Sequence, residues 1–122
     1  MDKNTRTSIH ITLLATVSTL LLGACSSLPS TPESAGVRIT NNEPVGCRFI
    51  GDITGNQGNL LLGQFTSNKN LETGARNDLK NQAVALGGNV VYLLTQRAGT
   101  TGNGTYIEQT NVTLAGNVYR CP

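Results

Sequence analysis

The longest apolar run of the chain lies near its N-terminus, from Ile9 to Leu22, and follows the basic residues Lys3 and Arg6. A short cationic stretch before an apolar stretch is typical of a secretory signal peptide. Five polar residues interrupt the run, which makes it too short and too polar for a membrane-spanning helix. We therefore expect residues 1–24 to be a signal peptide.

The clearest periodic pattern predicts a helix from about Asn70 to Leu86. Its apolar residues recur every three or four positions: Leu71, Ala75, Leu79, Ala83 and Leu86. This spacing places them on one helical face. Glu72 and Arg76 stand four residues apart and add slight support. Gly87-Gly88 predicts the end of the helix, because glycine adopts the left-handed conformation without strain.

Four other segments have the composition of β-strands. They are a short edge strand at Val37–Thr40, a first core strand at Cys47–Thr54, a buried strand at Asn89–Thr95 and a last strand at Thr105–Tyr119. In the first core strand, the alternation places Cys47, Phe49 and Ile53 on one face. Glycine and threonine from Gly99 to Gly104 predict a turn between the last two strands.

The order of these elements predicts an α+β fold for residues 37–122. A strand-helix-strand crossover makes the first and second core strands parallel, and the hairpin makes the third strand antiparallel to the second. If the third strand lies in the middle, Cys121 comes to lie beside Cys47. We expect a small two-layer sandwich with one helix packed on a mixed sheet of three or four strands.

The three cysteines predict two kinds of covalent chemistry. Leu22-Gly23-Ala24-Cys25 resembles a bacterial lipobox, in which the thiol of Cys25 would carry a diacylglyceryl group and the freed amine a fatty acid such as palmitate. Acyl chains of this kind would anchor the protein to a membrane; the alternatives are an uncleaved anchor or a plain secreted protein. In an exported small domain, Cys47 and Cys121 predict a single disulfide. The alternative is two separate buried thiols.

The segment after Cys25 predicts a tether. From Ser26 to about Ser34 it is rich in serine, threonine and proline, so we expect residues 25–36 to be a lipidated, flexible connection to the domain. Ser26, in the second mature position, is similar to the residue found in lipoproteins sent to the outer membrane.

Composition limits the remaining possibilities. Without residues 1–24 the chain has 98 residues, enough for one small domain, and the absence of Trp leaves a core of Val, Leu, Ile and Ala. Seven basic and six acidic side chains then remain, a net charge of +1, and the basic ones are scattered. Nucleic-acid binding, which needs a clustered basic face, is not expected.

Catalysis is not expected either. His10, the only histidine, lies in the predicted signal peptide. The thiol of Cys25 is assigned to the lipid, and those of Cys47 and Cys121 to a disulfide. The acidic residues are dispersed without the spacing of a metal site or an acid/base pair. We therefore predict no catalytic residue, no metal and no cofactor. A hydrolase that uses Asp52 or Glu108 is the least favoured alternative, and it would need one of them in a pocket with a raised pKa.

One apolar group stands out in the polar connection between the first core strand and the helix. It consists of Leu60, Leu61, Leu62 and Phe65. These residues could contact a partner protein or a membrane, or they could form a lid over the helix and the sheet edge. The turn at Gly99–Gly104 could likewise be an adaptable binding loop or a mobile hairpin tip.

Several motifs together resemble the uncharacterised bacterial lipoproteins of the YjeI type, a family with a domain of unknown function. They are the lipobox, Cys47–Gly55, Gly74–Ala83, Gly87–Tyr92 and Gly116–Pro122. The resemblance covers nearly the whole mature domain. It implies attachment to the outer membrane on its periplasmic face and carries no known activity.

The layout is also distantly similar to the signalling domain of the Rcs envelope-stress lipoprotein RcsF, which implies the alternative of a stress sensor. That family has two disulfides and a longer tether, whereas this chain has cysteines for only one. The sequence as a whole predicts a non-enzymatic outer-membrane lipoprotein that binds another envelope protein through the Leu60–Phe65 loop or a sheet edge.

Overall fold

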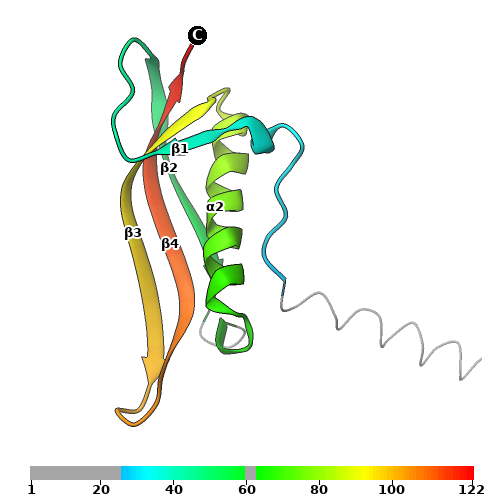
Figure 1. Ribbon diagram of the computed structural model, residues 1–122, viewed down its shortest axis with the longest axis vertical. Coiled ribbons are helices and arrows are strands. Elements are labelled where there is room, and N and C mark those ends of the chain that lie inside the picture. The colour runs from blue at the N-terminus through cyan, green and yellow to red at the C-terminus, as the bar shows by residue number, and fades with distance from the viewer. Residues whose placement is uncertain (1–25, 60–62) are drawn as a thin grey trace, which may run out of the picture.

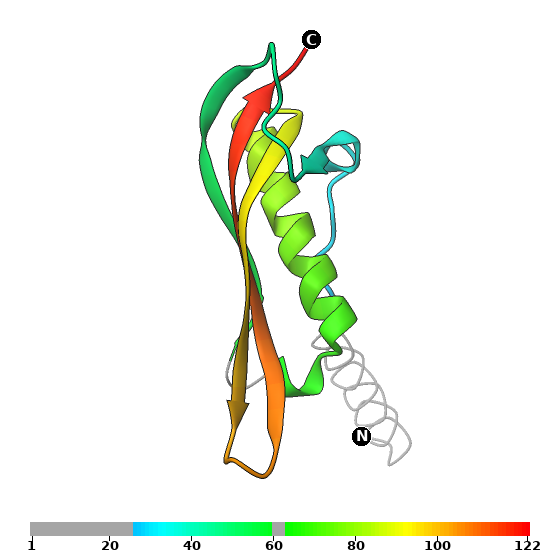
Figure 2. The same ribbon diagram turned by 60° about the vertical axis from the view of Figure 1, so that its left-hand side comes forward.

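The computed structural model describes residues 26–59 and 63–122, and it consists of one helix packed on one face of a four-stranded sheet (Figures 1 and 2). The predicted α+β fold is confirmed. In chain order the elements are η1 (Ser34–Gly36), β1 (Arg38–Thr40), β2 (Arg48–Gly58), η2 (Gly63–Phe65), α2 (Asn68–Ala85), β3 (Val90–Gly102) and β4 (Ile107–Arg120). The predicted signal peptide, Cys25 and Leu60–Leu62 lie outside the described residues.

The sheet has the strand order β1-β3-β4-β2, so the last strand lies between the two other long strands as predicted. β4 runs antiparallel to both β2 and β3, and the short β1 runs parallel to the first residues of β3. Every long pairing therefore involves β4. In Figure 1 the long strands bend gently past the helix, and the β3–β4 hairpin extends beyond the helix at its lower end.

The core lies between α2 and the face of the sheet that it covers. Four of the five residues in the predicted stripe are fully buried: Leu71, Ala75, Leu79 and Ala83. From β4, alternate residues meet them: Val112, Leu114 and Val118. The fifth stripe residue, Leu86, is exposed because it is already the C-cap of the helix.

Local hydrogen bonds fix both ends of α2. The Ser67 hydroxyl accepts from the backbone N–H of Asn70 and caps the N-terminus. At the other end Gly87 has φ +84°, as the predicted stop requires. Its N–H donates to the Val84 carbonyl, and the next N–H, from Gly88, donates to the Ala83 carbonyl. These two hydrogen bonds form a Schellman motif, which ends a helix at a residue in the left-handed conformation.

The sheet approaches the helix closely because Gly55 stands where they cross. A Cβ atom at this position would lie 2.6 Å from both the Ala75 carbonyl oxygen and the Leu79 backbone nitrogen. Any larger residue would collide with helix backbone, so Gly55 sets the distance between the two layers.

Two details of the predicted strands are wrong. A bulge between Phe49 and Gly51 adds one residue to β2, which reverses the alternation, so Phe49 and Ile53 lie on opposite faces. Phe49 pairs with Tyr119 on the face away from the helix, and their rings meet edge to face. The predicted turn at residues 99–104 starts too early, since β3 continues to Gly102 in register with β4.

The disulfide between Cys47 and Cys121 is confirmed, with Cα atoms 4.4 Å apart. It joins the start of β2 to the residue after β4. Asn89 holds the same chain end, because its side-chain amide donates to the Cys121 carbonyl and accepts from the Cys121 N–H.

The segment predicted as a flexible tether is held against α2 from Leu28 onward. The Leu28 N–H donates to Gln57 Oε1 (3.0 Å), and Asn77 Nδ2 donates to the Leu28 carbonyl (2.7 Å). One helical turn further along, the Thr31 N–H donates to Asn81 Oδ1 (3.0 Å). These amide side chains thus bond to backbone N–H and carbonyl groups of the segment.

Candidate functional site

The two long outer strands of the sheet differ in how their free edges are covered. On the outer edge of β2, Gln82 Nε2 donates to the Thr54 carbonyl (2.8 Å), and Asp78 Oδ2 accepts from the Asn56 N–H (2.9 Å). Both side chains come from α2, one helical turn apart. They satisfy two backbone groups that a further strand would otherwise bond, so this edge is covered at residues 54–56.

The outer edge of β3 has no such cover. β1 pairs only with residues Val90–Tyr92, and β3 continues for ten residues beyond that point. Among residues 26–59 and 63–122, no hydrogen bond outside the β3–β4 pairing reaches the backbone from Leu93 to Gly102. Register shifts interrupt the pairing near Leu94 and again after Gly99, which leaves residues 95–99 as a regular stretch between them. An uncovered edge of this kind is a template for another strand.

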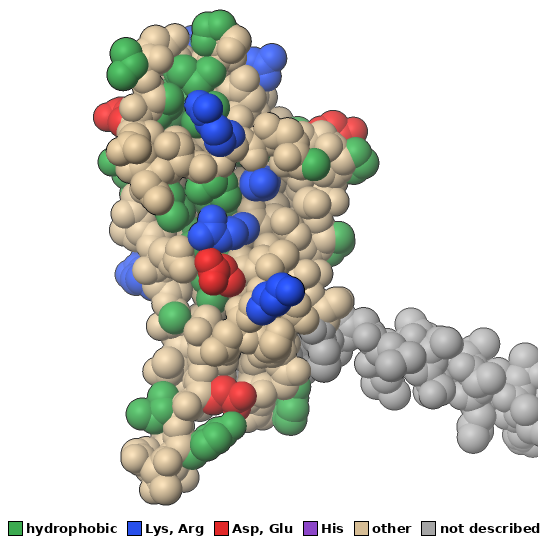
Figure 3. Space-filling model, viewed as in Figure 1, with side chains coloured by type: hydrophobic (Ala, Val, Ile, Leu, Met, Phe, Trp, Pro, Cys, Tyr) green, Lys and Arg blue, Asp and Glu red, His purple; other side chains and the backbone are tan. Residues whose placement is uncertain are grey.

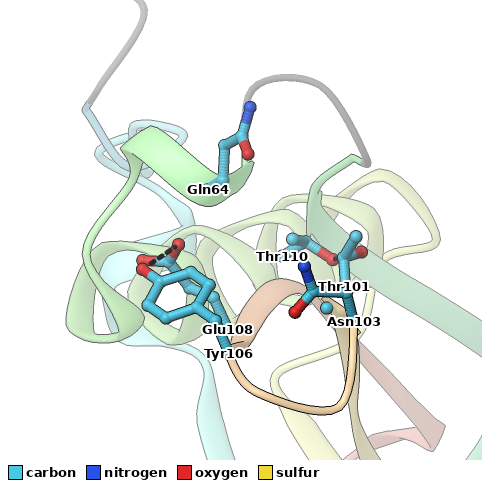
Figure 4. A pocket seen from close by; sticks show the side chains of 7 residues that line it. Gln64, Thr101, Asn103, Tyr106, Glu108 and Thr110 are labelled. Atoms are coloured by element: carbon cyan, nitrogen blue, oxygen red, sulfur yellow. Dashed lines mark hydrogen bonds between the residues drawn. The ribbon is translucent and has the colours of Figure 1, made fainter.

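A shallow hollow of about 170 Å³ lies where η2 faces the β3–β4 hairpin (Figure 4). Its lining residues are Gln64, Thr101, Gly102, Asn103, Tyr106, Glu108 and Thr110. The Tyr106 hydroxyl donates to Glu108 Oε2 at 2.9 Å. This hydrogen bond, followed by repulsion from the same carboxylate, raises the pKa of Tyr106 above its ordinary value. The hollow is open to solvent, and most of the side chains that line it carry a hydroxyl or an amide group.

Three large apolar side chains are exposed around this end of the molecule. Phe65 on η2 is 69% exposed, Tyr106 is 65% exposed and Ile107 is 68% exposed. Figure 3 shows hydrophobic side chains around the hairpin at the lower end, and others in the upper half of the molecule. The lid interpretation therefore does not hold for Phe65, because its side chain does not enter the core. Leu60, Leu61 and Leu62, predicted with it, lie outside the described residues.

The two carboxylates considered for hydrolysis are far apart. Asp52 is exposed and pairs with Asn117 of β4, whereas Glu108 pairs with Thr101 near the hairpin tip. Nine residues of β4 separate these two positions, a distance of about 30 Å along a strand. Within the described part of the chain, no three His, Cys, Asp or Glu residues cluster as metal ligands would.

Sequence reasoning did not find the apolar hairpin tip. Tyr106 and Ile107 follow directly after the turn glycine Gly104 and Thr105, and an adjacent aromatic and aliphatic pair at a turn was the signal available. A free sheet edge was predicted in general terms. The choice of β3 over β2 depends on Gln82 and Asp78, whose targets only the folded chain defines.

The fold and these surfaces define a small, single-disulfide α+β domain with one open sheet edge and an apolar tip. In the described part of the chain, no helix is long and apolar enough to cross a membrane.

Residues 29–121 match the model of a protein family described as a domain of unknown function, DUF4156. The chain belongs to this family. It is 38% identical over 119 residues to the uncharacterised protein YjeI of Escherichia coli K12, covering 93% of this chain and 99% of that protein. The YjeI proteins of Escherichia coli O6:H1 and Shigella flexneri match to the same extent.

Proposed function

We propose that this protein is a lipoprotein of the bacterial outer membrane, anchored through Cys25, whose periplasmic domain binds another envelope protein. The binding element is the outer edge of β3, where residues 95–99 accept an extended strand of the partner. Main-chain hydrogen bonds supply the affinity in this mode, and side chains beside the edge supply the selectivity.

The contrast between the two sheet edges carries this proposal. Two α2 side chains bond to backbone groups in the middle of the β2 edge, and ten residues of β3 are left without any described partner on their outer edge. Proteins usually protect free edges against chance pairing. An edge left open beside one that is covered is therefore a candidate for a specific use.

Anchoring supports binding through a short edge. A stretch of about five residues makes few main-chain bonds and binds weakly on its own. A lipid at Cys25 confines the domain to the membrane surface, where a partner in the same envelope meets it at high effective concentration. The signal peptide and the lipobox-like residues 22–25 support this placement, and Ser26 supports the outer membrane. No catalytic step is assigned to the domain.

The test is site-specific photocrosslinking in intact cells. A photoreactive residue is placed at Gln96 on the open edge, and a matched one at Asn56 on the covered edge, since both positions are exposed and polar. We expect a discrete crosslinked product from position 96 and none from position 56. Cys25→Ala should remove most of the product.

A blocking variant completes the test. Ala98→Lys places a charge on the open edge, a device that natural edges use against pairing, and Asn56→Lys is its control on β2. We expect the first to abolish the product and the second to leave it unchanged, with both proteins melting close to the parent. Equal products from both edges, or a product that survives Ala98→Lys, would contradict the proposal.

A further inference from the structure

The position of the anchor is restricted by the segment that follows it. Only Ser26 and Ser27 separate Cys25 from Leu28, whose N–H and carbonyl are both held, by Gln57 and Asn77. Three residues of extended chain span about 10 Å. A lipid attached at Cys25 would therefore hold Leu28, and with it the domain, within about 10 Å of the attachment point.

The direction of the segment shows which end of the domain the anchor approaches. Thr31 is bound at Asn81, and Leu28 is bound one helical turn earlier, at Asn77. Followed toward Cys25, the chain thus runs toward the N-terminal end of α2. Both ribbon views agree, because the segment descends along the helix toward its lower end (Figures 1 and 2).

The same end carries three large apolar side chains that are each about two-thirds exposed. η2, with Phe65, immediately precedes α2, and the hairpin with Tyr106 and Ile107 lies across the hollow from η2. From Thr100 to Ile107 the hairpin contains no charged residue. Tyrosine with aliphatic neighbours is the composition found at the boundary between lipid headgroups and acyl chains. The opposite end carries the disulfide and the charged residues Glu43, Arg48 and Arg120, together with the exposed Val45 and Phe49.

We infer that Phe65, Tyr106 and Ile107 form a second membrane contact. They would lie against the same lipid bilayer that holds the anchor. The inference depends on the proposed lipid anchor at Cys25. One end of the domain then faces the bilayer, and the disulfide end points away from it. The open edge of β3 stands beside the membrane, where it is accessible to a partner in the same envelope.

A single tryptophan reports on this contact, because the natural chain contains none. The variants are Tyr106→Trp and Ile107→Trp at the apolar tip and Val45→Trp as the control, since Val45 is 97% exposed near the disulfide. Each full-length lipoprotein is purified and reconstituted into vesicles of phosphatidylethanolamine and phosphatidylglycerol, with and without brominated acyl chains. Bromine quenches only a tryptophan that reaches the acyl region.

We expect at least twofold quenching of the tryptophan at position 106 or 107, with a shift of its emission to shorter wavelength, and no quenching at position 45. Flotation of the same vesicles measures the anchor separately. Protein that floats while neither tip tryptophan is quenched would overturn the membrane contact and leave the anchor standing. A shift of emission without quenching would assign the tip to a contact with a second copy of the chain, and would overturn the membrane contact as well. Failure to float would overturn the anchor, and the inference with it.

Discussion

Two side chains on one turn of α2 decide which edge of the sheet is available. Gln82 and Asp78 bond to the Thr54 carbonyl and the Asn56 N–H, so the β2 edge resembles a strand that already has a neighbour. At the disulfide end, Asn89 does the same for the last residues of the chain, through both of its amide atoms. In each case a polar side chain forms hydrogen bonds with backbone groups that have no neighbouring strand. The hydrophobic pattern of the sequence cannot indicate such hydrogen bonds.

The pKa of Tyr119 gives a prediction at the residue scale. Its hydroxyl donates to Glu43, and this hydrogen bond, then burial, then repulsion from the carboxylate raise the pKa above the ordinary value of 10.0. A raised pKa in the folded state stabilises the protonated phenol. That stability is fully present below pH 10 and is lost as the pH rises through the raised value.

Glu43→Gln should therefore lower the pKa of Tyr119 toward its ordinary value, and the loss of stability above pH 10 should become smaller. Phenolate absorbance during a pH titration measures the first effect, and thermal melts across the same range measure the second. Tyr119→Phe identifies which transition belongs to this residue. Identical titrations for the parent and Glu43→Gln would contradict the assigned cause.

At the element scale, the helix was predictable and the strand details were not. Apolar residues such as Leu71 and Leu79 repeat at helical spacing, and Gly87 marks the end, so the sequence itself carries this information. The bulge after Phe49 has no comparable signal, because it depends on the register with β4. The same limit applies to the path of residues 28–31, which is set by hydrogen bonds to the helix.

Gly55 gives a prediction about how β2 meets α2. Gly55→Ala would press a methyl group against helix backbone at 2.6 Å, so we expect a loss of about 1–3 kcal/mol in the free energy of unfolding. Denaturant titration of the parent and the variant measures this difference in the free energy of unfolding. Gly36→Ala is the matched control, since a Cβ atom there meets nothing within 4 Å. Equal stabilities for the two variants would show that the layers can separate without cost.

At the scale of the whole molecule, one small core and one disulfide hold the domain together. The disulfide links two residues that are 74 apart in sequence, and it joins the start of β2 to the end of β4. The sequence predicted this pairing because two cysteines in an exported small domain favour a disulfide, and a central last strand is compatible with it, since it places Cys121 beside Cys47. The position of the hairpin tip beside η2 and the hydrogen bonds of residues 28–31 to the domain were not predicted, because each depends on contacts between residues distant in sequence.

Replacing both cysteines, as Cys47→Ala with Cys121→Ala, should reduce the free energy of unfolding by about 4 kcal/mol. That is a large share of what a domain of this size can have. Denaturant titration of the oxidised parent and the double variant measures the difference. Reduction of the parent is the control and should give a similar loss; a change below about 1 kcal/mol would contradict the role assigned to the bond.

The proposed binding mode and the membrane contact both depend on a lipid at Cys25. The most direct measurement is mass spectrometry of the N-terminal peptide from protein isolated from the outer-membrane fraction. We predict a chain that begins at Cys25 and carries a diacylglyceryl group on its thiol and a fatty acid on its amine. A chain that begins elsewhere, or an unmodified Cys25 in a soluble fraction, would contradict the account.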